Sequence, residues 1–108
     1  MNNLKISTAQ FENRSGDKKY NLSIIEELAG RAAAEGAQAI AFHECSVTGY
    51  SFARHLSREQ MLELAEFIPN GESIEALAEV AGRHHITVLA GLFEKDAAGL
   101  LYKAYVCV

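Results

Sequence analysis

The chain has 108 residues, of which 49% are hydrophobic and 22% are charged, and its net charge at pH 7 is −4. This composition is typical of one globular domain, or part of a larger one, and argues against a disordered chain. The basic residues are scattered, and no apolar run approaches the roughly 20 residues of a membrane span. We therefore expect no nucleic-acid surface and no membrane anchor.

The cysteine content and the N-terminal sequence bear on the cellular compartment of the protein. Cys45 and Cys107 are too few for a disulfide scaffold, which favours a reducing environment. The first ten residues contain no uninterrupted apolar region of the kind found in signal peptides. We expect a soluble, cytoplasmic protein.

The first half of the chain predicts two strands around a helix. Residues 4–10 have the composition of a strand, and residues 15–17 predict a turn and a helix cap. Apolar side chains then recur every four residues over 18–35, which predicts an amphipathic helix that ends at Gly36. The short apolar run 37–42 predicts a strand that is covered on both faces.

The next segment predicts a pair of helices. Residues 57–60 have the spacing of a capping box and open a helix that carries apolar residues through Phe67. Residues 69–71, Pro-Asn-Gly, break this helix. A further helix has apolar positions between Ile74 and Ala81 and ends near the pair His84-His85.

The last segment predicts a hairpin. Residues 86–93 are the clearest buried strand, residues 94–99 form a polar turn, and residues 100–108 predict a further strand. The order strand, helix, strand, helices, strand, strand predicts the α/β class, with a sheet that is at least partly parallel. Ligands in such sheets bind outside the carboxyl ends of the strands, and His43-Glu44-Cys45 follow the second strand directly.

Glu44 and Cys45 each admit a functional and a structural interpretation. A carboxylate directly after an apolar strand is partly desolvated, which suits general-base chemistry, but Glu44 could equally cap the next turn or pair with an arginine such as Arg54. Cys45 could be a nucleophile with His43 as its base, because residues two apart share a face if the strand continues. If the strand ends at residue 42, the geometry favours neither role, and most cysteines in such places are small buried hydrophobes.

The sequence gives no support for a metal or a nucleotide cofactor. His84 and His85 stand at a helix end without a cysteine or aspartate at ligand spacing, and contact with the last helix carbonyls is the favoured interpretation. The glycines form neither a GxGxxG nor a Walker pattern. We therefore predict no cofactor and no metal.

Several short motifs follow one another along the chain. They are Ala9-Gln10 in the first strand, Asn21-Leu22 early in the helix, Phe42-His43-Glu44 at the second strand end, Thr48-Gly49-Tyr50 after it, and the stretch from Asn70 to Tyr102 with its strand and hairpin. Together and in this order they resemble the N-terminal part of the nitrilase superfamily, the carbon-nitrogen hydrolases, and the resemblance spans essentially all 108 residues.

This resemblance implies an αββα sandwich and a Glu-Lys-Cys triad that hydrolyses a small-molecule amide, nitrile or carbamoyl substrate. Glu44 matches the catalytic glutamate of the family, and Tyr50 is expected to wall the pocket. His43 replaces the usual proline, and Lys103 stands where the family has asparagine, out of register with the catalytic lysine. Neither Cys45 nor Cys107 matches the nucleophile.

The expectation is therefore that residues 1–108 form the N-terminal part of a carbon-nitrogen hydrolase domain, incomplete and inactive alone, with Glu44 as its only catalytic residue. Two alternatives stay open. One is a truncated, non-catalytic α/β module that self-associates, and a homo-oligomer is expected in either case. The other is an unrelated α/β ligand-binding domain in which Glu44 is structural.

Overall fold

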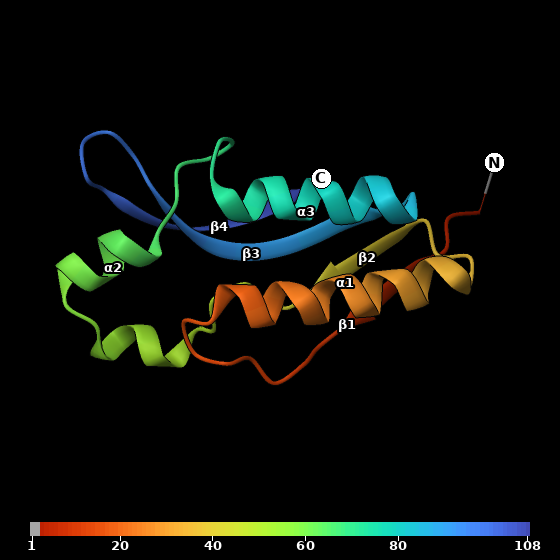
Figure 1. Cartoon of the computed structure of the whole chain (residues 1–108), viewed down its shortest axis with the longest axis horizontal. Helices are drawn as coiled ribbons and strands as arrows, with labels where there is room; N and C mark the ends of the chain where they lie inside the picture. Colours follow the sequence, from red (N-terminus) through yellow and green to blue (C-terminus); the bar gives the residue numbers. More distant parts are fainter. Residues whose placement is uncertain (1–2) are drawn as a thin grey trace.

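The computed structural model describes residues 3–108, which form one four-stranded sheet, three α-helices and one 3-10 helix (Figure 1). The strands are β1 (Ile6–Ala9), β2 (Ala39–Phe42), β3 (Thr87–Lys95) and β4 (Leu101–Cys107). The helices are α1 (Lys18–Ala34), η1 (Ser51–His55), α2 (Arg58–Leu64) and α3 (Glu72–His84).

The strands lie in the sheet in the order in which they occur in the chain. β1 pairs with β2 and β2 with β3 in parallel, whereas β3 and β4 form an antiparallel hairpin. Helices occupy both parallel crossovers, as a parallel connection requires. The predicted α/β class and its hairpin are therefore confirmed.

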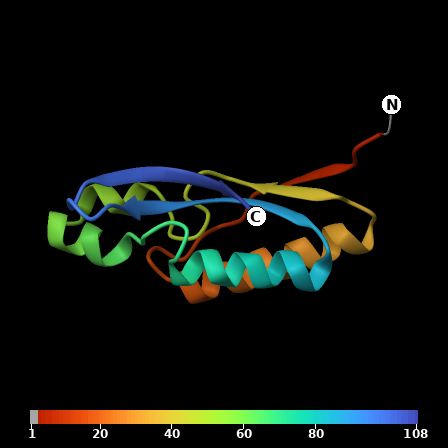
Figure 2. The ribbon, with the colours of Figure 1, turned by 90° about the horizontal axis from the view of Figure 1, so that it is seen from above.

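The helices α1 and α3 both cover one face of the sheet (Figure 2). The main core lies between these two layers, and a fully buried aliphatic side chain there contributes about 1.5–3 kcal/mol. Its fully or almost fully buried members include Ile25 and Ala29 of α1, Leu77 of α3, and Ile40, Val88, Ala90 and Leu92 of the sheet.

The opposite face of the sheet carries the alternate side chains, because successive residues of a strand point to opposite faces. No helix covers this face along β1, where Ile6 is 54% exposed, and Tyr105 on β4 is 49% exposed. Among the described residues, those that cover this face lie at its far end, where Phe93 packs with Cys45 and Ala65 in a second, smaller cluster. The segment after β2 therefore folds over this end of the sheet.

The helix boundaries follow from the capping residues that the sequence shows. The Asp17 side chain accepts a hydrogen bond from the Tyr20 amide and caps α1, and Gly36 follows the helix with φ +89°. Ser57 and Gln60 form a reciprocal capping box at the start of α2. These three predictions are confirmed.

Three details differ from the sequence-based expectations. The helix expected to continue to Phe67 ends at Leu64, because Glu66 is extended and pairs with Glu94 of β3. The strand expected to end at residue 93 continues to Lys95, because the pairing with Glu66 and the hairpin with β4 satisfy the hydrogen-bonding groups of its backbone. The 3-10 helix η1 had no clear sequence signal.

No helix within residues 3–108 is long and apolar enough to cross a membrane.

Candidate active site

Glu44 lies two residues beyond the carboxyl end of β2, and its side chain is 61% exposed. Its Oε1 atom is 3.1 Å from Nζ of Lys103, so the partner of Glu44 is this lysine and not Arg54. The desolvation expected after an apolar strand is absent, because the strand ends at Phe42 and the carboxylate leaves the core. Glu44 is therefore an accessible carboxylate paired with a cation.

Lys103 reaches Glu44 from the hairpin. It stands opposite Phe93 in the β3–β4 register and projects from the sheet face that the helices leave uncovered. Its ammonium also donates to Oη of Tyr50 at 3.3 Å and lies 5.0 Å from the centre of the Tyr50 ring. Hydrogen bonds to Glu44 and then to Tyr50 raise the pKa of Lys103, so the lysine is a cation at neutral pH.

Cys45 is fully buried beside this pair. Burial, followed by the negative charge of Glu44, raises the pKa of the Cys45 thiol to about 11, and the charge of Lys103 opposes this rise. The thiolate is the reactive form of cysteine, and at neutral pH Cys45 is almost entirely protonated. The geometry therefore agrees with the interpretation of Cys45 as a small buried hydrophobe.

Gly91 of β3 makes the sharp turn at Cys45 possible. Cys45 has a left-handed backbone with φ 53°, and its carbonyl accepts hydrogen bonds from the amides of Thr48 and Gly49. A Cβ atom on Gly91 would lie 2.3 Å from the Cys45 backbone nitrogen. Only glycine at position 91 allows the turn to approach the sheet this closely.

His43 is held away from catalytic partners. Its Nε2 atom is 2.6 Å from Oδ1 of Asn13, and its ring packs edge-on against Phe11 at a centroid distance of 5.0 Å. Burial lowers the pKa of His43, which favours the neutral ring. Because β2 ends at Phe42, the shared strand face that a Cys45–His43 pair requires does not exist.

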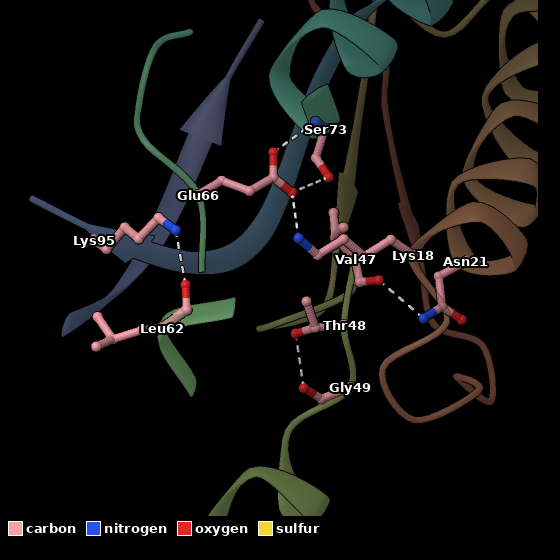
Figure 3. Close-up of polar contacts among 9 residues, drawn as sticks. All are labelled: Lys18, Asn21, Val47, Thr48, Gly49, Leu62, Glu66, Ser73 and Lys95. Atoms are coloured by element: carbon pink, nitrogen blue, oxygen red, sulfur yellow. Dashed lines mark hydrogen bonds and ion pairs between the residues drawn. The ribbon is translucent and has the colours of Figure 1, made fainter. Parts of the chain in front are cut away.

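A buried asparagine fixes the loop that follows Glu44 (Figure 3). Asn21 of α1 is fully buried and donates from Nδ2 to the carbonyls of Arg14 and Val47, at 2.9 Å each. Ser46 adds a second anchor, because its Oγ accepts from the Gly91 amide at 3.1 Å. Asn21 of the Asn21-Leu22 motif thus anchors this loop to α1, a role that could not be predicted from the sequence.

Glu66, in contrast to Glu44, is a buried carboxylate, and its role was not predicted from the sequence (Figure 3). It accepts from Nζ of Lys18 at 2.8 Å and from the Ser73 amide at 2.7 Å, and also from the Ser73 hydroxyl. Burial acts to raise the pKa of Glu66, but the bonds from Lys18 and Ser73 outweigh it, and the net effect is a lowered pKa. Its one sequence signal is a carboxylate between apolar residues.

A cavity of about 220 Å³ is lined in part by Lys103, the ion-pair partner of Glu44. Tyr50, Ala53 and Phe93 form its less polar walls, and Lys103 and Arg54 contribute positive charge. Tyr50 lines this cavity, and its role at a substrate pocket stays a prediction from the family resemblance. A carboxylate that can accept a proton, a neighbouring cation and a concave surface lie together at one end of the sheet.

Neither histidine at the end of α3 lies in a metal site. His85 ends the helix with φ 51°, and the His84 side chain faces α1 instead of the last carbonyls, with Nε2 3.7 Å from a carboxylate oxygen of Glu26. Within residues 3–108 no group of three or more histidine, cysteine, aspartate or glutamate side chains is placed to hold a metal ion.

Comparison with known families identifies the relationship. Residues 5–108 match the family described as carbon-nitrogen hydrolase. The chain belongs to the carbon-nitrogen hydrolase family.

Two curated members of this group illustrate the relationship. The chain is 33% identical over 105 residues to a nitrilase of Pyrococcus abyssi, an alignment that covers 97% of the chain and 38% of that protein. It is 35% identical over 107 residues to an arylacetonitrilase of Macrophomina phaseolina, covering 92% of the chain and 30% of that protein. This carbon-nitrogen hydrolase chain thus spans less than two fifths of the length of either relative.

Solved structures show the same fold. One is an amidase from Nesterenkonia sp. AN1, in a variant whose active-site cysteine carries the product of acrylamide addition. It superposes on the chain with a TM-score of 0.75 at 20% sequence identity, and the alignment covers 98% of the chain and 39% of the amidase. An N-terminal amidase bound to a Gln-Val peptide gives 0.78 at 21% identity, with 97% of the chain and 25% of the amidase covered. The carbon-nitrogen hydrolase chain therefore has the nitrilase-type α/β fold.

Proposed function

We propose that this chain supplies the general base of a carbon-nitrogen hydrolase, and that the base is Glu44. The observation that carries the proposal is the exposed Glu44 carboxylate beyond the end of β2, 3.1 Å from the ammonium of Lys103, which itself lines a cavity. Membership of the family supports the reaction class, hydrolysis of a non-peptide C–N bond in a small amide, nitrile or carbamoyl compound.

The proposed chemistry makes Glu44 the proton carrier in both steps, formation of the cysteine adduct and its hydrolysis. It takes the proton of a cysteine thiol as the sulfur attacks the substrate carbon, and for an amide it returns that proton to the departing ammonia. It then takes a proton from the water that attacks the resulting thioester, which releases the acid and restores the thiol. A lysine stabilises the oxyanion in both steps.

This chain contributes only the glutamate to that triad. The pKa of Cys45 is raised to about 11 by burial and by Glu44, and its side chain is buried, so it is no substitute nucleophile. Lys103 already pairs with Glu44 and is a partner of the base. The purified 108-residue chain should release no ammonia from amides or nitriles, and substantial turnover would contradict this.

The coding sequence after Val108 provides the direct test of the proposal. It should encode a lysine after the next turn and a cysteine at the end of a later strand. An in-frame stop codon directly after Val108 would contradict the catalytic proposal and favour the second candidate function.

That second candidate is a non-catalytic α/β module that associates with copies of itself. The observation that favours it is the sheet face without helices, where Ile6 and Tyr105 are about half exposed. Apolar surface of this kind and the free edge of β1 promote association. A stable monomer in sedimentation experiments would count against it.

A further inference from the structure

The cavity that Lys103 lines has walls of two kinds. The Tyr50 and Phe93 rings and the Ala53 methyl group provide apolar surface, and Phe93 is almost fully buried. Arg54 at the end of η1 and Lys103 on β4 bring two cations to the same cavity. A volume of about 220 Å³ suits a short aliphatic or single-ring ligand.

The two cations are not equivalent, because only one has an anionic partner. Lys103 is paired with Glu44, whereas the Arg54 guanidinium makes no ion pair with a carboxylate within residues 3–108. Its Nε donates to Nε2 of His55 at 3.3 Å, which leaves the two terminal amino groups for another partner. Glu44, Lys103 and Arg54 together therefore leave one positive charge unbalanced at the cavity.

An unbalanced guanidinium at a concave, partly apolar surface attracts a single anion. A carboxylate is the complementary group, since the planar fork of arginine can donate two parallel hydrogen bonds to it. A second anion would be disfavoured, because Glu44 already neutralises Lys103. The cavity thus fits one carboxylate at the Arg54 side and a neutral group at the Lys103 side, where the lysine pairs with Glu44.

We propose that the substrate is an amide or nitrile whose far end carries a carboxylate, and that Arg54 is the residue that selects it. The proposal rests on the proposed function, because it assumes that the C–N bond is presented to Glu44. Arg54 acts here on binding, so its role can be measured without turnover.

The test is an NMR titration of the ¹⁵N-labelled 108-residue chain with succinamate and with succinamide. The two probes have the same shape and an amide at one end, and they differ in the charge at the other end. Succinamate should shift the Arg54 Nε–H signal and the amide signals of Tyr50 and Phe93 in a saturable way. Succinamide should bind about tenfold more weakly, as expected for the loss of a charge-assisted hydrogen bond.

Two variants complete the experiment. Arg54→Gln should weaken succinamate binding about tenfold and leave succinamide binding unchanged, whereas Arg31→Gln on the exposed surface of α1 should alter neither. Equal affinity for the two probes, an unchanged affinity in Arg54→Gln, or no succinamate binding would each overturn the proposal. Binding without hydrolysis in the full-length protein would contradict only the proposed function.

Discussion

At the scale of single residues, Glu44 is exposed because the next residue, Cys45, is buried in the core. Cys45 turns into the core with a left-handed backbone, and the missing side chain of Gly91 gives that turn its room. The carboxylate is consequently directed outward to Lys103. The thiol that looked reactive in the sequence thus helps to place the glutamate.

Gly91→Ala should be strongly destabilising. The added methyl group would meet the Cys45 backbone nitrogen at 2.3 Å, and such overpacking typically costs about 1–3 kcal/mol of the free energy of unfolding. Urea denaturation of both chains measures the difference. Gly82→Ala is the matched control, because no atom lies within 4 Å of its Cβ position on α3 and helix propensity predicts a gain of about 0.5–1 kcal/mol. Equal stability of the Gly91→Ala variant and the parent would show that the turn is not tightly packed.

At the scale of elements, Glu66 joins three segments. Its carboxylate accepts hydrogen bonds from Lys18 at the start of α1 and from Ser73 in the first turn of α3. Its backbone forms hydrogen bonds with the end of β3. Gly71 leaves space for the carboxylate, since a Cβ there would lie 2.5 Å from Oε1 of Glu66. This contact holds both helices against the end of the sheet near Glu44.

Glu66 should make the fold sensitive to acid. Its folded pKa is lower than its ordinary value, because hydrogen bonds from Lys18 and Ser73 outweigh the opposing effect of burial. Its stabilising contribution is therefore complete above the ordinary carboxyl range near pH 4.5 and is lost as the pH falls through the lowered folded pKa. Glu66→Gln should lower the free energy of unfolding at pH 7 by about 1.5–3 kcal/mol and flatten its decline with acid.

Urea midpoints measured between pH 3 and pH 7 test this prediction. The control is Glu63→Gln, which changes an exposed carboxylate on α2 three residues away. If the Glu63 and Glu66 variants lost the same stability at every pH, the Glu66 contacts would contribute nothing specific.

The element pattern could be predicted from sequence because it depends on local signals. Asp17, Gly36 and Ser57 mark helix boundaries through their own caps, and the apolar run in β3 is unmistakable. The Glu44 position followed from the strand end and the family resemblance. Its contact with Lys103 could not be predicted, because it depends on the hairpin register that places residue 103 opposite residue 93. The extended pairing of Glu66 with Glu94 is likewise a tertiary contact that overrides helix propensity.

At the scale of the whole molecule, the main feature is that the two faces of the sheet are covered unequally. Within residues 3–108, two helices cover one face, and the other face is covered only where the segment after β2 folds back (Figure 2). The resemblance to the nitrilase superfamily implies an αββα sandwich, so we expect the uncovered face to pack against a partner surface.

The 108-residue chain should therefore self-associate in solution. Sedimentation velocity over a range of concentrations should show species larger than a monomer. Ile6→Lys should shift the distribution toward the monomer, because it places a charge on the exposed apolar face. The control Leu4→Ala changes another exposed apolar residue without adding a charge and should have a smaller effect. A concentration-independent monomer would contradict the expectation.

The central claim is that Glu44 is the general base of a carbon-nitrogen hydrolase. The most direct measurement is the rate of ammonia release from an amide substrate by the full-length protein with Glu44→Gln, compared with the parent and with Glu12→Gln as an exposed control. The account predicts a loss of about 10²–10⁴-fold for Glu44→Gln, with the fold intact by circular dichroism, and no change for Glu12→Gln. Activity retained in a folded Glu44→Gln protein would contradict it.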